Sequence, residues 1–444
     1  MMKYCPRFYD YVYIDDSQGK FCLCQWMVHD KMVLGNLMDD DIETVYNSEH
    51  AKLLRTTMDD QSFKYCRFEA CPHLQNNDLE EISAEEYEQR KKETYYPTEI
   101  NMAYDFVCNQ SCETCRTSVF KPPANYGRQM GTIREKLAPY LDTAKKITAS
   151  GHGDPFASKY MMEVLENLNP TDPELTILLE TNGVFFDEMH WERIKHLGKF
   201  NLEIVVTINS FDEFTYRHIS RGGDYRKVLK NLEYISDLRK SNNISVLSNS
   251  FVIQDRNFRE IPGFIKRSFD DYAFDRVVLK PVYQWGTMDE KVYWFKDVLN
   301  PLHPYHNEYL EILNNPMLSD DRVYNFGGDT VHEVWDYPCC KTNSPVVFPY
   351  ELINKDSKVI IYGAGQIGRE YVRQLQKTEY CQLVLWVDKQ SMNEHVNTPD
   401  LLLSFSKDNF DFIILATRNS AFLQEMQKIV KNAGIPEARV VVPG

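Results

Sequence analysis

Short hydrophobic runs alternate with longer amphipathic stretches between residues 98 and 285. Short apolar runs bounded by turn residues are typical of buried strands, and apolar residues that recur every three or four positions are typical of helices. The predicted strands are 98–104, 145–150, 175–181, 202–208, 244–253 and 276–282, and the predicted helices are 132–143, 158–168, 187–197, 224–239 and 257–270. The repeated strand-then-helix order predicts parallel strands joined by right-handed crossovers.

Six such units are fewer than the eight of a closed barrel, so the pattern predicts an α/β fold built on a partial (β/α)6 TIM-like barrel. Residues 355–444 resume the alternation and predict a separate, small α/β domain. The remaining regions are a small domain rich in cysteine and aromatic residues, a charged linker helix, and an irregular connection. They occupy residues 1–75, 76–97 and 286–350, respectively.

The composition limits the class of partner. A formal net charge of -15 argues against nucleic acid, because a protein needs a basic face to neutralise phosphates. No run approaches the roughly 18 to 20 apolar residues that span a bilayer, and the first residues lack the apolar core of a signal peptide. We therefore expect a cytoplasmic protein without a membrane partner, whose 11 cysteines serve some purpose other than disulfides.

Three of these cysteines follow the first predicted strand of the barrel. Cys108, Cys112 and Cys115 have the spacing CxxxCxxC. Thiolates are soft ligands suited to iron–sulfur centres, and three of them hold three irons of a 4Fe–4S cluster while the fourth iron stays open. A zinc knuckle and a purely electron-carrying cluster are the alternatives, although no fourth ligand for zinc lies nearby.

This motif after a first barrel strand resembles the signature of the radical S-adenosylmethionine (SAM) superfamily. One residue departs from the family pattern: Thr114 stands where an aromatic residue usually precedes the third cysteine. The resemblance implies that SAM chelates the open iron and is cleaved by one electron. The resulting 5′-deoxyadenosyl radical then abstracts hydrogen from a substrate.

Later segments resemble further elements of the same family in the same order. SGHGDPF (150–156) is similar to the family's Gly-Gly-Glu element, and residues 207–235 are similar to its fourth-strand segment. In the first, glycines would admit backbone close to the methionyl ammonium and a carboxylate would add charge complementarity. In the second, a polar residue would meet the ribose and an arginine would pair with the carboxylate. The residues that match these SAM contacts are Gly151, Gly153, Asp154, Asn209, Ser210 and Arg221.

The first 75 residues carry a second cysteine pattern, C-x13-G-x4-C followed by two more cysteines. It resembles the auxiliary-cluster domain called SPASM, or its shorter twitch relative, although such domains usually follow the barrel. The resemblance implies one fully ligated 4Fe–4S cluster on Cys5, Cys24, Cys66 and Cys71. A structural zinc site is the alternative. Cys22 alternates with Cys24 on a strand and should point away. The roles of Cys339 and Cys340 stay open.

GAGQIG (363–368) follows a predicted strand and opens a predicted helix, and an acidic residue ends the next strand. This is the local context of a dinucleotide fingerprint, in which glycines allow close backbone approach and the acid meets ribose hydroxyls. The domain looks like a small Rossmann-like module. Its candidate residues for binding a nucleotide or NAD are Gly363, Gly365, Gly368 and Asp388, and a packing or docking role is the alternative.

These elements together predict a radical SAM enzyme, an oxidoreductase in which an auxiliary 4Fe–4S cluster takes an electron from the substrate radical. The expected substrate is a sugar, a nucleotide sugar or another small molecule, with a peptide as the second choice. The expected electron donor is a one-electron reductase such as flavodoxin or ferredoxin. Two alternatives remain: a non-catalytic iron–sulfur electron carrier, and an NAD-linked oxidoreductase with structural zinc sites.

Overall fold

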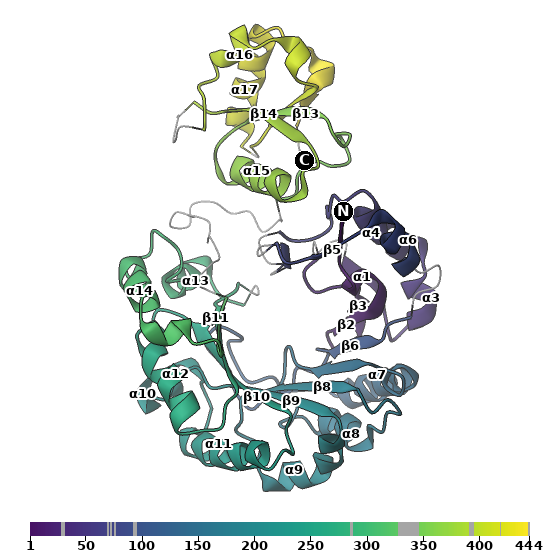
Figure 1. Ribbon diagram of the computed structural model, residues 1–444, viewed down its shortest axis with the longest axis vertical. Coiled ribbons are helices and arrows are strands. Elements are labelled where there is room, and N and C mark those ends of the chain that lie inside the picture. Colours follow the sequence, from purple (N-terminus) through teal and green to yellow (C-terminus); the bar gives the residue numbers. More distant parts are fainter. Residues whose placement is uncertain are drawn as a thin grey trace.

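The computed structural model describes residues 1–442 except 28–31, 69–70, 72, 75–76, 92–95, 285–286, 327–345, 390–394 and 418. Cys339 and Cys340 lie outside the described residues, so the question about their roles does too. A curved sheet with helices around it forms the larger part of the molecule, and a smaller α/β domain follows at the C-terminal end (Figure 1). No helix in the described ranges is both long and apolar enough to cross a membrane.

Six parallel strands form the centre of the large sheet, as the hydrophobic pattern predicts. Their order in the sheet is their order in the chain, because each helix returns the chain to the next position. The strands are β6 (Glu99–Met102), β7 (Lys146–Ala149), β8 (Thr176–Thr181), β9 (Asn201–Thr207), β10 (Val246–Ile253) and β11 (Arg276–Pro281).

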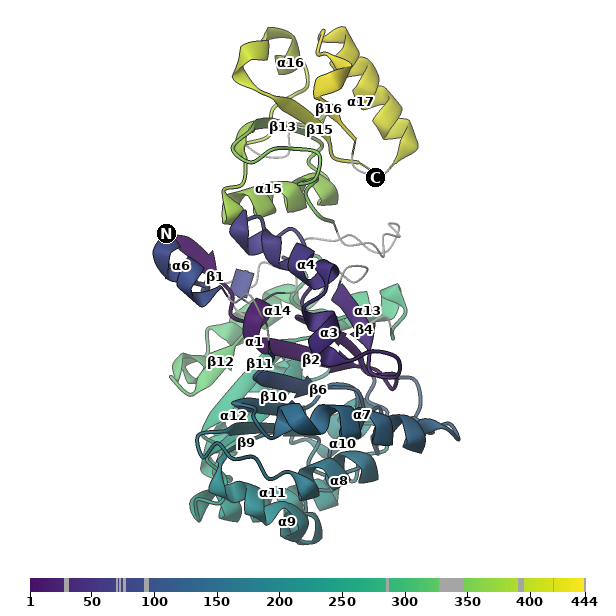
Figure 2. The same ribbon diagram turned by 90° about the vertical axis from the view of Figure 1, so that its right-hand side faces the viewer.

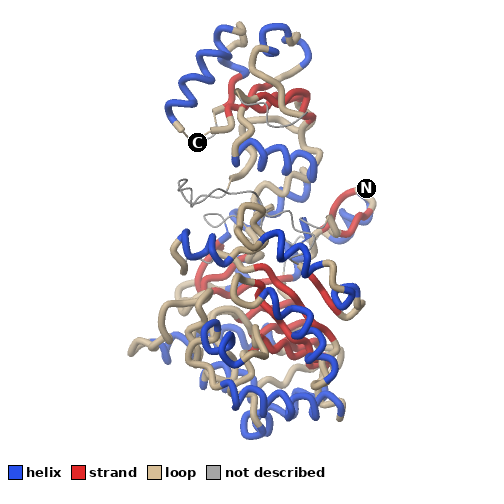
Figure 3. Tube along the Cα trace, turned by 90° about the vertical axis from the view of Figure 1, so that its left-hand side faces the viewer, coloured by secondary structure: helices blue, strands red, loops and turns tan. Residues whose placement is uncertain are grey.

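The helices between these strands cover the outer, convex face of the sheet (Figures 1 and 3). On β9 this face consists of Leu202, Ile204 and Val206, which are fully buried in the main hydrophobic core. The helical elements are α7 (Tyr126–Leu141), α8 (Lys159–Asn167), α9 (Glu188–Ile194), η1 (Lys195–Lys199), α10 (Glu213–Ile219), α11 (Tyr225–Lys240), η2 (Phe258–Glu260) and α12 (Ile261–Asp270). The short helix α10 was not predicted.

Successive residues of a strand point to opposite faces, so the residues between the buried ones line the concave face. This face carries polar and charged side chains. The register places Glu180 of β8 and Lys280 of β11 on this face. Lys280 Nζ lies 3.6 Å from Glu180 Oε1, so the two side chains meet across two intervening strands. This meeting requires a strongly curved sheet. The concave face is therefore the wall of an open barrel.

The N-terminal region extends this sheet and is not a separate unit beside it. Strand β2 (Tyr11–Asp15) pairs in parallel with β6. Strand β3 (Lys20–Cys22) then pairs antiparallel with β2, and β4 (Val33–Asn36) pairs antiparallel with β3. Among the described residues the sheet has ten strands. An open barrel leaves the edge of its first strand unpaired, and β2 covers that edge. The small cysteine-rich domain predicted at 1–75 therefore shares its sheet with the barrel.

The other N-terminal elements lie beside strands β2 and β4 (Figure 2). They are β1 (Met2–Tyr4), α1 (Arg7–Asp10), α3 (Ile42–Tyr46), α4 (Glu49–Asp59), β5 (Glu80–Ile82) and α6 (Ala84–Arg90). The predicted linker helix at 76–97 is wrong in part, because residues 80–82 form a strand that pairs with β1. Ile82 is buried in the main core, which outweighs the helical pattern of its charged neighbours.

The connection after β11 is more regular than expected. It contains α13 (Glu290–Lys296), α14 (His306–Leu313), η3 (Pro316–Ser319) and β12 (Val323–Asn325). Strand β12 pairs in parallel with β11 and covers the other side of the six-stranded centre. The prediction of an irregular 286–350 region is therefore wrong for its first part, where prolines masked the short elements.

The C-terminal domain is a four-stranded parallel sheet between two helical layers (Figure 1). Its elements are β13 (Lys358–Tyr362), α15 (Gln366–Thr378), β14 (Gln382–Val387), α16 (Leu401–Ser404), η4 (Lys407–Asn409), β15 (Phe412–Leu415), α17 (Ser420–Asn432), η5 (Glu437–Arg439) and β16 (Val440–Val441). Alternate residues of β13 face the two layers: Val359 and Ile361 pack toward α15, while Ile360 and Tyr362 pack toward α16 and α17.

Candidate functional site

The cysteine loop leaves β6 at Asp105, a buried carboxylate. It accepts hydrogen bonds from the Tyr126 hydroxyl at 2.7 Å, from the Val107 backbone N–H at 3.0 Å, and from the Ser158 hydroxyl. Tyr126 begins α7 and Ser158 caps α8. Because two helices hold the same carboxylate, the loop starts in a defined direction.

The loop then turns tightly around Cys112. The backbone N–H groups of Cys115 and Arg116 both donate to the Cys112 carbonyl, at 2.9 and 3.1 Å. Burial raises the pKa of the Cys112 thiol to about 12, and the neighbouring thiols of Cys108 and Cys115 add to this shift. The three thiols therefore lie close enough to influence one another's ionisation. Each is only partly buried, which suits a cluster that keeps one iron open.

Burial also raises the pKa of the Cys108 thiol to about 12, and the Asp154 carboxylate contributes. Such thiols stay protonated at neutral pH until a metal displaces the proton. Two amides that were not predicted lie against these sulfurs. Asn182 Nδ2 is 3.7 Å from Cys108 Sγ, and the Cys112 thiol donates to Gln110 Oε1 at 3.2 Å. Asn182 belongs to the segment ETNG, which ends β8 and could have suggested it.

Gly151 and Gly153 bring the loop after β7 against the start of the cysteine loop. Gly151 has a φ of +103°, and a Cβ there would lie 2.5 Å from the Cβ of Ala103. A Cβ at Gly153 would lie 2.4 Å from the Asp105 carbonyl oxygen and 2.6 Å from that of Val107. Only glycine fits both positions, because the backbone that leads to Cys108 occupies the space of a side chain.

Asp154 is buried and tied to the next strand. Its carboxylate accepts from the Thr181 hydroxyl at 2.8 Å and from the Asn182 backbone N–H at 2.7 Å, and its own N–H donates to the Val107 carbonyl at 2.9 Å. Burial raises the pKa of Asp154, although the Asn182 and Thr181 hydrogen bonds oppose the shift. Asp154 thus joins the ends of β7 and β8 to the cysteine loop.

Arg221 follows α10 and clamps the cysteine loop. Its Nε donates to the Ser111 carbonyl and its Nη2 to the Arg116 carbonyl, both at 2.8 Å. The Ser111 N–H donates in return to the Arg221 carbonyl at 2.8 Å. The guanidinium therefore lies at the cluster loop, and its contact with the SAM carboxylate stays a prediction.

Asn209 and Ser210 follow β9 at the same end of the sheet. Asn209 has a φ of 60°, and its Oδ1 accepts from the Val252 N–H at 2.8 Å. The Ser210 hydroxyl is buried and donates to Glu260 Oε2 at 2.5 Å. Of the two candidates for the ribose, Ser210 is thus already engaged inside the protein.

Two buried polar side chains near this end have no hydrogen-bond partner within the described part of the chain. They are the Ser250 hydroxyl on β10 and the Gln254 amide just after that strand. A buried polar group without a partner is costly, so we expect ordered water or a bound molecule to meet these two side chains. The polar run SNS in an otherwise buried strand could have indicated Ser250.

A buried ion pair joins the cysteine loop to α13. Lys296 Nζ lies 2.8 Å from Glu113 Oε2 and 3.7 Å from Asp255 Oδ1. Lys296 is 3% exposed. A buried cation that loses its partners is strongly destabilising. The segment after β11 is therefore bound to Glu113, which lies between Cys112 and Cys115 in the cysteine loop.

The N-terminal cysteines form a second group. Burial raises the pKa of the Cys5 thiol to about 12, and Cys24 and Cys71 add to the shift. Burial raises the pKa of the Cys71 thiol to about 11. Burial also raises the pKa of the Cys66 thiol well above its ordinary value, and the thiols of Cys71, Cys5 and Cys24 all add to that shift. The four predicted ligands therefore lie near one another in the N-terminal region.

No three His, Cys, Asp or Glu side chains of the described residues lie close enough to hold a single metal ion. Cys22 is fully buried in the hydrophobic core, and its largest electrostatic neighbour is Asp15. Cys24 also influences this thiol, so the separation of Cys22 from the group stays a prediction.

The C-terminal glycine loop has the expected strand–loop–helix geometry. Gly363 has a φ of 121°, Gly365 precedes α15, and a Cβ at Gly368 would lie 1.8 Å from the Gly363 carbonyl oxygen. The Asp388 carboxylate accepts from the Ala364 N–H at 2.6 Å, so one of its oxygens holds the glycine loop.

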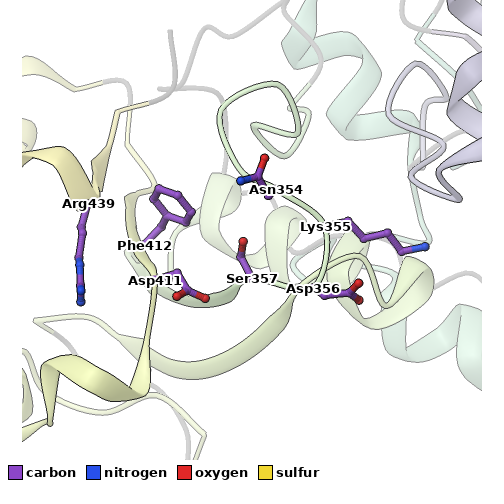
Figure 4. Close-up of a pocket in the computed structure, with 7 residues that line it drawn as sticks. All are labelled: Asn354, Lys355, Asp356, Ser357, Asp411, Phe412 and Arg439. Atoms are coloured by element: carbon purple, nitrogen blue, oxygen red, sulfur yellow. The ribbon is translucent and has the colours of Figure 1, made fainter.

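A depression in the same domain lies at the other end of its sheet, where β13 and β15 begin (Figure 4). Both acidic and basic side chains line it, and Arg439 donates to the Lys407 and Phe410 carbonyls. The depression is thus separate from the glycine loop. Its lining residues are Asn354, Lys355, Asp356, Ser357, Asp411, Phe412 and Arg439.

Comparison with known proteins places two families on this chain. The family model described as "Radical SAM superfamily" matches residues 106–267, and the model described as "Iron-sulfur cluster-binding domain" (SPASM) matches residues 5–72. Neither match reaches the C-terminal domain. The Rossmann-like assignment and nucleotide binding of that domain therefore stay predictions.

A curated relative is the GTP 3′,8-cyclase of Alkaliphilus oremlandii (strain OhILAs), 29% identical over 163 residues, which are 35% of this chain and 49% of the relative. The chain thus spans about half the length of that relative. Among solved structures, Streptococcus suis SuiB bound to S-adenosylmethionine is 11% identical with a TM-score of 0.35, covering 71% of this chain and 70% of that one. A radical SAM methyltransferase from Sphaerobacter thermophilus is 14% identical with a TM-score of 0.30, covering 52% and 67%.

The matched ranges coincide with the two cysteine groups described above. Residues 106–267 contain Cys108, Cys112 and Cys115, and residues 5–72 contain the four N-terminal ligands. Residues 106–267 therefore match a radical SAM domain, and residues 5–72 match a SPASM domain at the N-terminal end.

Proposed function

We propose that the enzyme cleaves SAM reductively and that the 5′-deoxyadenosyl radical removes hydrogen from a substrate in the open barrel. The observation that carries this proposal is the packing of the cysteine loop on the glycine element and on the Arg221 segment. All of these segments follow strands at one end of a parallel sheet, the end at which barrel enzymes place their active sites.

Each side chain has a proposed task in binding. Cys108, Cys112 and Cys115 hold the cluster, which supplies the electron for SAM cleavage. Gly151, Gly153 and Asp154 position the backbone beside the methionyl group, and Arg221 orients the loop and the carboxylate. Asn209 is preferred to Ser210 at the ribose, because the Ser210 hydroxyl already donates to Glu260.

We assign the auxiliary cluster to Cys5, Cys24, Cys66 and Cys71 and propose that it accepts an electron from the substrate radical. A cluster with four protein ligands has no open iron for SAM. Net oxidation of the substrate follows from this role. A soluble one-electron donor of the flavodoxin or ferredoxin class would supply the cluster that binds SAM.

We propose a polar small molecule, a sugar or nucleotide sugar, as the substrate, with a peptide as the alternative. The Glu180–Lys280 pair on the concave face suits a polar ligand. The relative named GTP 3′,8-cyclase bears the name of a nucleotide substrate, which supports the small-molecule class. A nucleotide site on the C-terminal glycine loop would serve the same class.

Anaerobic reconstitution tests the proposal. Two cubane clusters require about eight irons per chain, and one requires about four. The Cys108, Cys112 and Cys115 triple alanine variant should retain about four irons and form no 5′-deoxyadenosine from SAM under reducing conditions.

Cys22→Ala is the matched control, because Cys22 is a buried thiol of the same region that is not one of the four proposed ligands. It should keep both clusters and the cleavage activity. Cleavage of SAM by the triple variant would contradict the proposal. The presence of zinc and the absence of iron in the unaltered protein would support the NAD-linked alternative instead.

A further inference from the structure

Arg7 lies beside the auxiliary cysteines and contacts one of their sulfurs. It is the first residue of α1, two positions after Cys5. Its Nη1 donates to Cys24 Sγ at 3.6 Å, and the Trp26 backbone N–H approaches the same sulfur at 3.4 Å. A guanidinium is always protonated in proteins, so a permanent positive charge lies at this sulfur.

The surroundings hold this guanidinium in place. Its Nη1 also donates to Gln25 Oε1 at 3.0 Å, and its plane lies over the Tyr11 ring, 4.6 Å from the ring centre. The Tyr11 hydroxyl donates to the same Gln25 oxygen at 2.7 Å. Arg7 is thus fixed by a planar amide and an aromatic face, and it cannot turn away from Cys24 without losing both contacts.

The same contacts continue into the barrel. Asn101 of β6 donates through Nδ2 to the Tyr11 hydroxyl at 3.0 Å, and Ser150 donates to Asn101 Oδ1 at 3.4 Å. Ser150 precedes Gly151 of the proposed SAM element. A chain of polar contacts therefore runs from Cys24 through Arg7, across the paired strands β2 and β6, to the loop beside the proposed SAM site.

We propose that Arg7 raises the reduction potential of the auxiliary cluster, so that this cluster takes up the electron from the substrate radical. The inference rests on the proposed function of the N-terminal cysteines. Hydrogen bonds to cluster sulfurs and the net charge around a cluster are two of the factors that set its potential. A fixed positive charge stabilises the added electron by Coulomb attraction, and burial strengthens that attraction.

The test is a redox titration of the reconstituted full chain, followed by electron paramagnetic resonance. The SAM-binding cluster is identified by the change of its signal when SAM is added, and the other signal belongs to the auxiliary cluster. Arg7→Gln keeps an amide donor but removes the charge. At the midpoint potential of the unaltered protein, we expect its ratio of reduced to oxidised auxiliary cluster to fall about tenfold, which is 59 mV for one electron.

Arg90→Gln is the matched control, because it removes the same charge from the same region while Arg90 pairs with Glu80 and Glu86. Its ratio should not change. Arg7→Lys keeps the charge and should restore most of the loss. If Arg7→Gln does not load iron, Arg7→Met takes its place, because it also removes the charge: the same decrease supports the proposal, and an unchanged ratio overturns it.

The outcomes separate the inference from the function on which it rests. Two clusters with an unchanged auxiliary ratio in Arg7→Gln would overturn the inference and leave the auxiliary cluster in place. A single cluster of about four irons in the unaltered protein would overturn both. A decrease confined to the auxiliary signal would support both.

Discussion

Gly153 offers a direct test of how the glycine element supports the cysteine loop. In Gly153→Ala the new Cβ would lie 2.4 Å from the Asp105 carbonyl oxygen. Real Cβ atoms do not approach closer than 3.0 Å, so the backbone that leads to Cys108 has to move by about 0.6 Å. Overpacking of this kind costs about 1 to 3 kcal/mol of unfolding free energy.

The displacement acts on the site more than on the fold. Misplacement by about 1 Å in an active site can cost about a hundredfold in rate. We therefore expect Gly153→Ala to form 5′-deoxyadenosine at least about tenfold more slowly and to bind SAM correspondingly more weakly. Anaerobic product analysis, iron counting and calorimetric titration with SAM measure these effects.

Gly131→Ala is the matched control, because a Cβ at this position of α7 meets nothing within 4 Å. It should leave SAM cleavage unchanged and add about 0.5 to 1 kcal/mol of stability. If Gly153→Ala cleaved SAM as fast as the Gly131 control and carried as much iron, the steric reasoning would be refuted.

Three further changes test other contacts. Arg221→Ala removes two hydrogen bonds to the cysteine loop and should lower the unfolding free energy by about 1 to 3 kcal/mol and reduce iron loading; denaturant titration and iron counting measure both. Burial opposes ionisation of Asp15, but the bond to His152, the Asp16 backbone N–H and the Lys20 charge together outweigh burial and lower the pKa of Asp15. The resulting stability is present above about pH 4 and is lost as the pH falls through the lowered pKa. In urea titrations, Asp15→Asn should therefore be less stable than the unaltered protein at pH 7, and the two should be nearly equal in stability at low pH. Asp388→Asn keeps an acceptor for the Ala364 N–H but loses the charge; we expect at least a tenfold loss of affinity for NAD or UDP-glucose by calorimetry. Equal affinity in this variant and the unaltered protein would exclude the proposed ribose contact.

The hydrophobic pattern was sufficient for the six central strands because parallel barrel strands are buried on their helix-facing side. On β9, for example, the alternate residues Leu202, Ile204 and Val206 are fully buried. The strand 80–82 was not foreseeable in the same way. Its partner β1 lies about 80 positions earlier in the chain, and local sequence contains no information on so distant a pairing.

Some residues of the candidate site were likewise predictable from local sequence, and others were not. Cysteine spacing alone indicates which thiols can share a cluster, because the ligands of the central cluster lie in one short loop. The hydrogen bonds of Arg221 to the cysteine loop depend on tertiary structure, since the carbonyls that accept them belong to residues about 110 positions away. The same holds for Lys296, whose partner Glu113 lies in the cysteine loop.

Sequence by itself indicated the resemblance to the radical SAM and SPASM families and the order of the six central strands, because these depend on residue type and on spacing within short segments. Only the tertiary structure showed that the N-terminal module joins the barrel through β2 and β6, which brings Arg7 and Tyr11 into contact with the barrel wall. An unpaired strand edge requires a partner, but several segments of a chain can supply one. The choice among them depends on packing of the whole chain.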